Sequence, residues 1–151
     1  MKQRAFWNLF IKMYPEFDHE VYTAWSFGEN PTILGQRVIE GKKQATTSAR
    51  VLYTVEQDSL PFVGQLNMIL NENREPMCIT ITTHVKVVPF NQVGYGHIIN
   101  EGEGYTSIEQ WRSDHYHYLK EACQYYGLEF HEEEDVVLET FKCIYPVNSK
   151  H

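Results

Sequence analysis

The most regular alternation of apolar and polar residues in the chain runs from Met77 to Val88. A period of two residues is typical of a β-strand, because successive side chains point to opposite faces of the sheet. We therefore predict one long strand here. Shorter extended segments are predicted where β-branched and aromatic residues gather, at Val21–Phe27, Gln65–Leu70 and Val136–Tyr145.

Other stretches repeat their apolar residues at helical spacing. They run over about Arg4–Met13, from Pro31 to Gly41, over Gln92–Ile98, and from Thr106 or Ser107 to Tyr126. Asn30 is a suitable N-cap for the second of these, and Gly41 and Gly127 suit the left-handed conformation that often ends a helix. Together these elements predict an α+β fold in a single domain that spans residues 1–151.

The segment after Gly41 is where a helix gives way to an extended chain. Thr46 to Ala49 should be extended, and alternation would then place Thr46, Ser48 and Arg50 on one face. Their hydroxyl and guanidinium groups suit a substrate carbonyl, a phosphate or a base edge, although threonine is also common in strands for packing alone. Val51–Val55 fits either a helical turn or a continuation of the strand.

Composition narrows the classes of function. The 151 residues carry a formal net charge of −7, which argues against a protein that binds duplex DNA by neutralising many phosphates. A pocket for a base or nucleoside fits this charge better than a long track for a polymer. Aromatic residues make up 14% of the chain, and Trp25 on the predicted strand could be a core ring or a cleft wall.

The three cysteines, Cys78, Cys123 and Cys143, are too widely spaced for a zinc motif, so we expect reduced and mostly buried thiols. The apolar run near the N-terminus is short and ends at Lys12, and no stretch approaches the roughly 20 apolar residues of a membrane span. We expect a soluble cytoplasmic protein that uses no cofactor.

Lys42 and Lys43 follow the predicted helix end at Gly41. A lysine acts as a base or nucleophile only when burial or nearby positive charge favours its neutral form. Two adjacent lysines after a helix are more often a solvated surface that complements the helix dipole. The spacing alone favours this second interpretation.

Glu101 and Glu103 stand in a predicted glycine-bracketed loop ahead of the last long helix. A carboxylate there can act as a general acid or base, or can simply complement the helix dipole. His115 lies on the apolar stripe of that helix, where a hydrogen-bonded core histidine is the usual outcome. His117 faces elsewhere and the other histidines complete no metal-ligand pattern, so we predict no metal site.

The residues Gly41-Lys42-Lys43-Gln44-Ala45-Thr46 match the G-x-K-x-x-T signature of the ASCH domain family, whose fold is similar to that of PUA domains. An ordered set of further segments between Val21 and Tyr145 resembles the larger bacterial ASCH proteins. These segments are Tyr22–Gly28, Pro61–Gly64, Val87–Phe90, and Glu101–Gly104 leading to Trp111-Arg112. The resemblance implies a small curved β-sheet or barrel surrounded by helices, with an N-terminal helix at about residues 4–13 packed on it.

Members of this family are discussed as RNA-binding modules, some have been credited with ribonuclease activity, and a small bacterial relative removes the acetyl group from N4-acetylcytidine. In that relative a lysine, a threonine and a glutamate perform the reaction. The resemblance carries these roles to Lys43, Thr46 and Glu103, with Glu101 as the fallback for the carboxylate. Ser48 occupies the position at which the small amidohydrolases often have an arginine.

Two hypotheses of different class follow. In the first, the chain hydrolyses a small amide-bearing modified nucleoside with Lys43, Thr46 and Glu103. The substrate would be bound by Trp25, Lys42, Ser48, Arg50 and Glu101. In the second hypothesis, the same cleft binds single-stranded RNA or a nucleotide without catalysis. Ribonuclease activity ranks below both, because the sequence shows no histidine pair or metal cluster.

Overall fold

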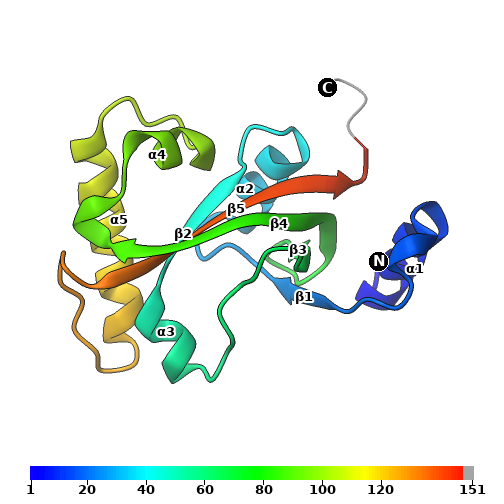
Figure 1. Cartoon of the computed structure of the whole chain (residues 1–151), viewed down its shortest axis with the longest axis horizontal. Coiled ribbons are helices and arrows are strands. Elements are labelled where there is room, and N and C mark those ends of the chain that lie inside the picture. The colour runs from blue at the N-terminus through cyan, green and yellow to red at the C-terminus, as the bar shows by residue number, and fades with distance from the viewer. Residues whose placement is uncertain (148–151) are drawn as a thin grey trace. The chain divides into compact units, whose positions relative to one another are not determined.

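The computed structural model describes residues 1–147 and contains both helices and strands (Figure 1). The helices are α1 (Gln3–Met13), α2 (Pro31–Ile39), α3 (Arg50–Val55), α4 (Tyr95–Glu101) and α5 (Ile108–Gln124). The strands are β1 (Tyr22–Trp25), β2 (Ala45–Ala49), β3 (Leu66–Leu70), β4 (Pro76–Pro89) and β5 (Asp135–Tyr145). Short 3₁₀ turns lie at Pro15–Phe17 and Phe90–Gln92.

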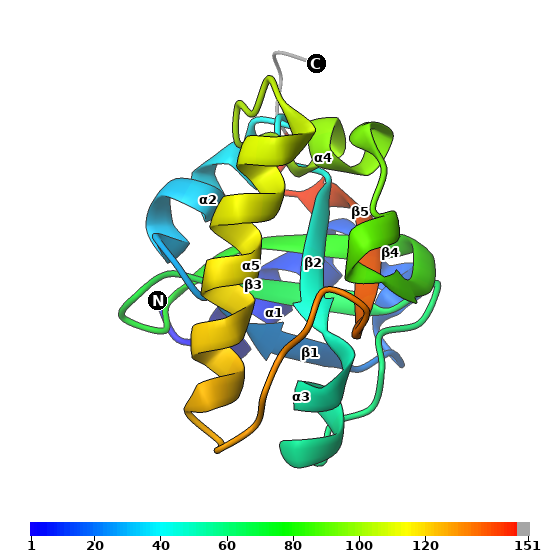
Figure 2. The ribbon, with the colours of Figure 1, turned by 90° about the vertical axis from the view of Figure 1, so that its left-hand side faces the viewer.

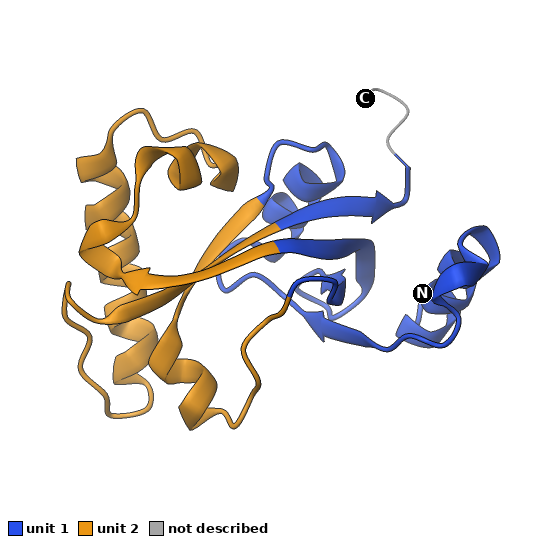
Figure 3. Ribbon diagram, in the orientation of Figure 1, with its two compact units in different colours: residues 1–44, 63–83, 141–151 blue, residues 45–62, 84–140 orange. Residues whose placement is uncertain are grey.

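The five strands form an open sheet in the order β1-β3-β4-β5-β2. β1 pairs with β3 in parallel, whereas β3 with β4 and β2 with β5 are antiparallel pairs. By their internal contacts the residues divide into two compact units (Figure 3). Unit 1 comprises Met1–Gln44, Val63–Thr83 and the chain from Phe141, and unit 2 comprises Ala45–Phe62 and His84–Thr140. The long strands β4 and β5 each contribute to both units.

The core of unit 1 is built on the β3–β4 hairpin. Phe10 of α1 is fully buried and packs against the apolar face of this hairpin. The residues that surround it include Leu66, Met68, Leu70 and Ile79. A second cluster contains Phe27, Val38 of α2, Ile69, Cys78 and Phe141. Helices α1 and α2 are therefore held by the apolar stripes that the sequence shows.

The core of unit 2 is built around Trp111 of α5, which is fully buried and stacks on Phe90. Helix α5 lies beside β2, and α4 contacts the same strand (Figure 2). Ser107 caps α5, because its hydroxyl accepts a hydrogen bond from the main-chain N–H of Gln110. The last long helix and its cap thus agree with the sequence prediction.

Several other predictions are confirmed. The long alternating run is β4, the N-terminal apolar stripe is α1, and the final extended segment is β5. The mixture of helices with an open five-stranded sheet confirms the α+β class. Cys78, Cys123 and Cys143 are free thiols; the first two are buried and the third is half-buried.

Four predictions need correction. Arg50 does not continue the strand face of Thr46 and Ser48, because β2 ends at Ala49 and Arg50 begins helix α3. The helix predicted over Gln92–Ile98 begins later, at Tyr95, after a 3₁₀ turn. It also includes Glu101, which is therefore a helix residue and not a loop residue. Asn30 precedes α2 with a left-handed backbone and makes no side-chain capping bond.

Candidate functional site

Lys42 and Lys43 follow the end of α2, where Gly41 adopts a φ of 78° that favours glycine. The main-chain N–H groups of both lysines bond to the carbonyl oxygen of Arg37. Their side chains then differ sharply, because Lys42 is 69% exposed and pairs with Glu40, whereas Lys43 is only 2% exposed. The surface interpretation is right for Lys42 and wrong for Lys43.

The surroundings of Lys43 in unit 1 are aromatic. Its Nζ lies 5.1 Å from the ring centroid of Phe27, within the range of a cation–π interaction. Phe27 in turn meets the ring of Trp25 edge to face at 5.0 Å. The Trp25 Nε1 donates a hydrogen bond of 3.1 Å to Oδ1 of Asn67, which fixes the indole at the end of β1. Trp25 is half-buried.

Strand β2 in unit 2 alternates as predicted. Ala45, Thr47 and Ala49 are buried, whereas Thr46 and Ser48 share the other face and are half-buried. Thr46 stands opposite Glu139 in the register with β5. The hydroxyl of Thr47 is the one that donates to Glu101, at 2.6 Å. Of the three consecutive hydroxyl residues Thr46, Thr47 and Ser48, Thr47 is therefore the one that contacts Glu101.

Glu101 is 1% exposed and accepts hydrogen bonds from several elements. Its Oε1 accepts a hydrogen bond of 2.6 Å from the indole N–H of Trp111, and its Oε2 accepts one from the hydroxyl of Thr47. Nε2 of His97, one turn earlier in α4, lies 3.3 Å from Oε2 of Glu101 and 2.9 Å from the hydroxyl oxygen of Thr47. Since the Thr47 proton goes to Glu101, the Thr47 oxygen accepts from His97. A buried carboxylate requires such partners.

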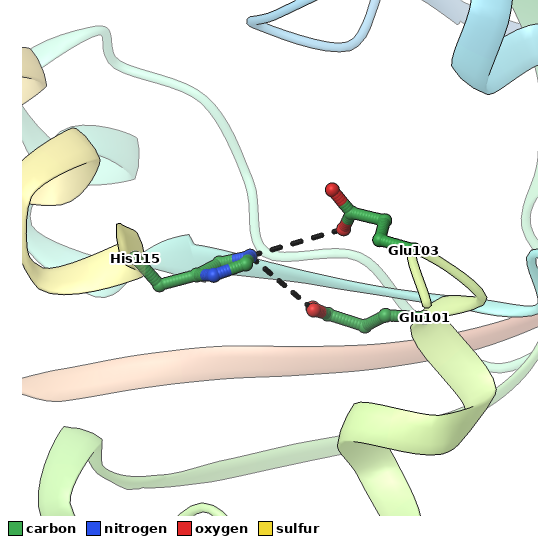
Figure 4. A group of neighbouring side chains, drawn as sticks. All are labelled: Glu101, Glu103 and His115. Carbon is green, nitrogen blue, oxygen red and sulfur yellow. Dashed lines mark ion pairs between the residues drawn. The ribbon is translucent and has the colours of Figure 1, made fainter. Parts of the chain in front are cut away.

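His115 joins Glu101 to Glu103 (Figure 4). Its Nε2 lies 3.3 Å from Oε1 of Glu101 and 3.8 Å from Oε2 of Glu103, and its ring stacks on Trp111 at 4.3 Å. Burial lowers the pKa of His115, but the hydrogen bonds and negative charges of Glu101 and Glu103 outweigh this and raise its pKa to about 9. The core histidine expected here is thus part of a charged cluster.

Arg50 lies elsewhere in unit 2, where its guanidinium is 3.7 Å from Oδ2 of Asp135. Both side chains are about half exposed, and they line a shallow open depression together with Thr54, Glu133 and Glu134. An exposed ion pair of this kind contributes little to stability. The structure gives Arg50 an acidic neighbour and a helical position, which differs from the strand-face role predicted for it.

The predicted site residues thus fall into separate groups. Trp25 and Lys43 belong to one aromatic cluster in unit 1, with Lys42 exposed beside it. Glu101 and Glu103 meet in unit 2 through His115. The convergence of Lys43, Thr46 and Glu103 stays a prediction.

Sequence reasoning missed Thr47, His97, Trp111 and His115 as members of the acidic cluster. Helical spacing offered one signal, because Trp111 and His115 are one turn apart in α5 and His97 and Glu101 are one turn apart in α4. The link between the two helices is not periodic, so the sequence pattern could not supply it.

Across the described residues 1–147, the helices are too short or too polar to cross a membrane. The family model for the ASCH domain matches residues 23–145 of the chain. A search of curated proteins returned no significant match.

Two solved structures are similar over most of their length. The first is protein EF3133 from Enterococcus faecalis V583, with 30% identity, a TM-score of 0.85, and coverage of 93% of this chain and 86% of that one. The second is an ASCH domain from Lactobacillus crispatus JV V101, with 28% identity, a TM-score of 0.79, and coverage of 95% of both chains.

Proposed function

The chain belongs to the ASCH domain family, and from this premise we propose that it hydrolyses the amide bond of a small acylated nucleoside. One observation carries the proposal: the lysine of the G-x-K-x-x-T signature, Lys43, is 2% exposed and its Nζ lies over the ring of Phe27. Lysines are rarely buried to this extent without a specific role or partner. Burial removes competing water and restricts the side chain to one position, as a catalytic amine requires.

In the proposed reaction, the Nζ of Lys43 takes a proton from a water molecule whose oxygen attacks the amide carbonyl carbon. The hydroxyl of Thr46 donates a hydrogen bond to the carbonyl oxygen as negative charge develops on it. The C–N bond then breaks, and Glu103 delivers a proton to the departing nitrogen. The products are a carboxylic acid and a free exocyclic amine. Lys43 then releases its extra proton to solvent and Glu103 takes one up, which restores both groups.

The aromatic cluster supports a base as part of the substrate. Trp25 is half-buried, is held by its hydrogen bond to Asn67, and meets Phe27, the ring over which Lys43 lies; we propose that a nucleobase stacks on it. The net charge of −7 favours a substrate with few phosphates. Both features fit a free nucleoside better than a long RNA.

The experiment is to incubate the purified chain with N4-acetylcytidine and other acylated cytidines and to follow cytidine release by chromatography. The key variant is Lys43→Met, which removes the amine while keeping most of the side-chain volume in its buried position. Lys42→Met is the matched control, because it makes the same change at the adjacent exposed lysine. We expect a loss of at least about 100-fold for Lys43→Met, within the range typical of general base removal, and a change of less than about threefold for Lys42→Met.

Absence of turnover across the panel would overturn the proposal, as would full turnover by a folded Lys43→Met protein. Thermal unfolding monitored by circular dichroism establishes whether the variant is folded. Tight binding of single-stranded RNA without any turnover would instead favour the non-catalytic binding module.

A further inference from the structure

The hydrogen bonding of His115 fixes the role of one ring nitrogen. Nδ1 lies 3.1 Å from the main-chain oxygen of Trp111, and because a carbonyl oxygen can only accept, Nδ1 carries a proton and donates it. In the neutral ring the other nitrogen, Nε2, then presents a lone pair. Nε2 faces the carboxylate oxygens of Glu101 and Glu103 (Figure 4). The charges of these electron-pair donors favour a proton or a metal cation between them.

The spacing of these donor atoms suits an ion larger than a proton. A single charged N–H prefers one acceptor at about 2.7–2.9 Å, whereas Nε2 of His115 is 3.3 Å from Glu101 and 3.8 Å from Glu103. Nitrogen and oxygen atoms that bind zinc at about 2.0–2.2 Å lie roughly 3.3–3.6 Å apart at tetrahedral angles. The distance to Glu101 lies in this range, and the distance to the partly exposed Glu103 exceeds it slightly. One donor atom from each of Glu101, Glu103 and His115 lies within 4.8 Å of the other two.

We propose that Glu101, Glu103 and His115 form a binding site for one divalent transition-metal cation. The three ligands come from the end of α4, the loop after it, and the second turn of α5. The site lies entirely within unit 2. The site shares Glu103 with the amide hydrolysis proposed above, but its test measures metal binding and not turnover, so failure of one proposal can be distinguished from failure of the other.

The hydrogen bonds that His115 and Glu101 make to neighbouring residues are of the kind expected for metal ligands. A ligating histidine usually donates its other N–H to a carbonyl or carboxylate, as His115 does to Trp111. The carboxylate of Glu101 also accepts hydrogen bonds from Trp111 and Thr47, and His97 lies 3.3 Å from its Oε2, so residues of three elements fix its orientation. These contacts fix the side chains of His115 and Glu101 in the metal-free protein.

Glu103, the third ligand, lies where a metal ion can reach the site from solvent. The Glu103 side chain is 24% exposed, in contrast to the buried Glu101, so an ion can enter on this side and keep water in its remaining coordination positions. One imidazole nitrogen with two carboxylates favours a borderline cation such as Zn²⁺ or Co²⁺. Mg²⁺ and Ca²⁺ prefer oxygen ligands throughout and are not expected to bind comparably.

The test uses the full chain after treatment with EDTA and buffer exchange. ZnCl₂ is titrated calorimetrically, and CoCl₂ is titrated while the visible absorption of Co²⁺ is recorded, with MgCl₂ as the comparison. We expect one equivalent of Zn²⁺ or Co²⁺ to bind and the melting temperature to rise with it. His115→Phe, which keeps a ring to stack on Trp111, and Glu103→Gln should each weaken binding at least about tenfold.

His117→Ala is the matched control for adventitious binding, because His117 and Glu121 form an exposed His–Glu pair on the same helix. Its affinity should equal that of the unmodified chain. If neither Zn²⁺ nor Co²⁺ binds saturably, the proposal is overturned. The cation between Glu101, Glu103 and His115 is then only the proton on His115. Equal binding by Glu103→Gln also overturns it, and because Glu103 is partly exposed this variant tests the site even if His115→Phe does not fold.

Discussion

Thr46 and Thr47 are consecutive residues of β2 that point to opposite faces, and Thr47 is the one that donates to the buried carboxylate of Glu101. Replacing Thr47 by valine keeps the shape and removes that donor, so Glu101 stays buried with one partner fewer. A hydrogen bond to a charged group contributes roughly 1.5–3 kcal/mol. We expect Thr47→Val to lower the free energy of unfolding by about 2 kcal/mol in urea denaturation.

Thr46→Val is the matched control, because it makes the same change on the other, half-buried face of the strand. Its stability should change by less than about 0.5–1 kcal/mol. If amide hydrolysis is the function, Thr46→Val should nevertheless lose activity, since the Thr46 hydroxyl is the one assigned to the carbonyl oxygen. Equal destabilisation by the two variants would contradict the structural role given to Thr47.

The raised pKa of His115 predicts that the stability of the metal-free protein depends on pH. Glu101 and Glu103 face its Nε2, and the ring of Tyr105, whose hydroxyl donates to Asp114, meets it edge-on. The folded pKa of about 9 exceeds the ordinary value of 6.5. The imidazolium therefore stabilises the fold fully below pH 6.5, and this stabilisation is lost as the pH rises through about 9.

We expect the free energy of unfolding, measured in urea with EDTA present, to fall by on the order of 2–3 kcal/mol between pH 6.5 and 9 through this group. Other groups titrate in the same range, so the relevant quantity is the difference from His115→Phe measured at each pH. This difference should shrink as the pH rises. A difference that is constant with pH would show that His115 contributes packing alone.

The sequence could suggest Lys43 but could not distinguish its environment from that of Lys42. Both are adjacent, both follow Gly41, and burial depends on where the rings of Phe27 and Trp25 lie in the fold. The same holds for His115, whose apolar stripe predicted a buried position. Its carboxylate partners come from a different helix and loop, and no local period encodes that contact.

At the scale of elements, the N-terminus of α5 holds Trp111 and His115 in place, because both lie in the first turns of that helix. The Ser107 hydroxyl satisfies the main-chain N–H of Gln110, which would otherwise lack an intrahelical partner. We expect Ser107→Ala to lower the free energy of unfolding by about 1 kcal/mol. Chemical denaturation followed by circular dichroism measures this change.

Ser113→Ala is the matched substitution within the exposed middle of the same helix. It should be neutral or slightly stabilising, because alanine has the higher helix propensity. A loss of stability as large as that of Ser107→Ala would mean that capping is not the reason for the effect.

Elements with strong periodicity or recognisable caps were predictable, and short elements after a turn were not. β4 and α5 carry long regular patterns, so local preference and tertiary packing agree in them. Arg50–Val55 is only a six-residue helix with mixed residues, which is why its pattern fitted either structure. The glycines Gly102 and Gly104 predict a loop for Glu101 and Glu103. In the structure Gly102 instead ends α4 with a left-handed backbone.

At the scale of the whole molecule, the ordered set of motifs predicted the family and the fold class. The ligand is less directly encoded. Under the proposed function it depends on Trp25 and Lys43 and on the field of the entire chain, whose net charge of −7 repels polyanions. The aromatic rings favour a long RNA as a ligand, but the negative net charge disfavours it. A free nucleoside can stack on the rings and carries no phosphate, so both features are compatible with it.

This difference gives a prediction about salt. A nucleoside has no phosphate, so its binding releases no counterions, whereas a protein that contacts three phosphates of single-stranded RNA loses roughly 20-fold in affinity between 50 and 200 mM salt. We expect the dissociation constant of N4-acetylcytidine, measured with the inactive Lys43→Met protein, to change less than about twofold over that range. A short single-stranded oligonucleotide should bind weakly at both salt concentrations. Tight oligonucleotide binding that weakens steeply with salt, without measurable nucleoside binding, would identify the molecule as an RNA-binding module, because only phosphate contacts produce that slope.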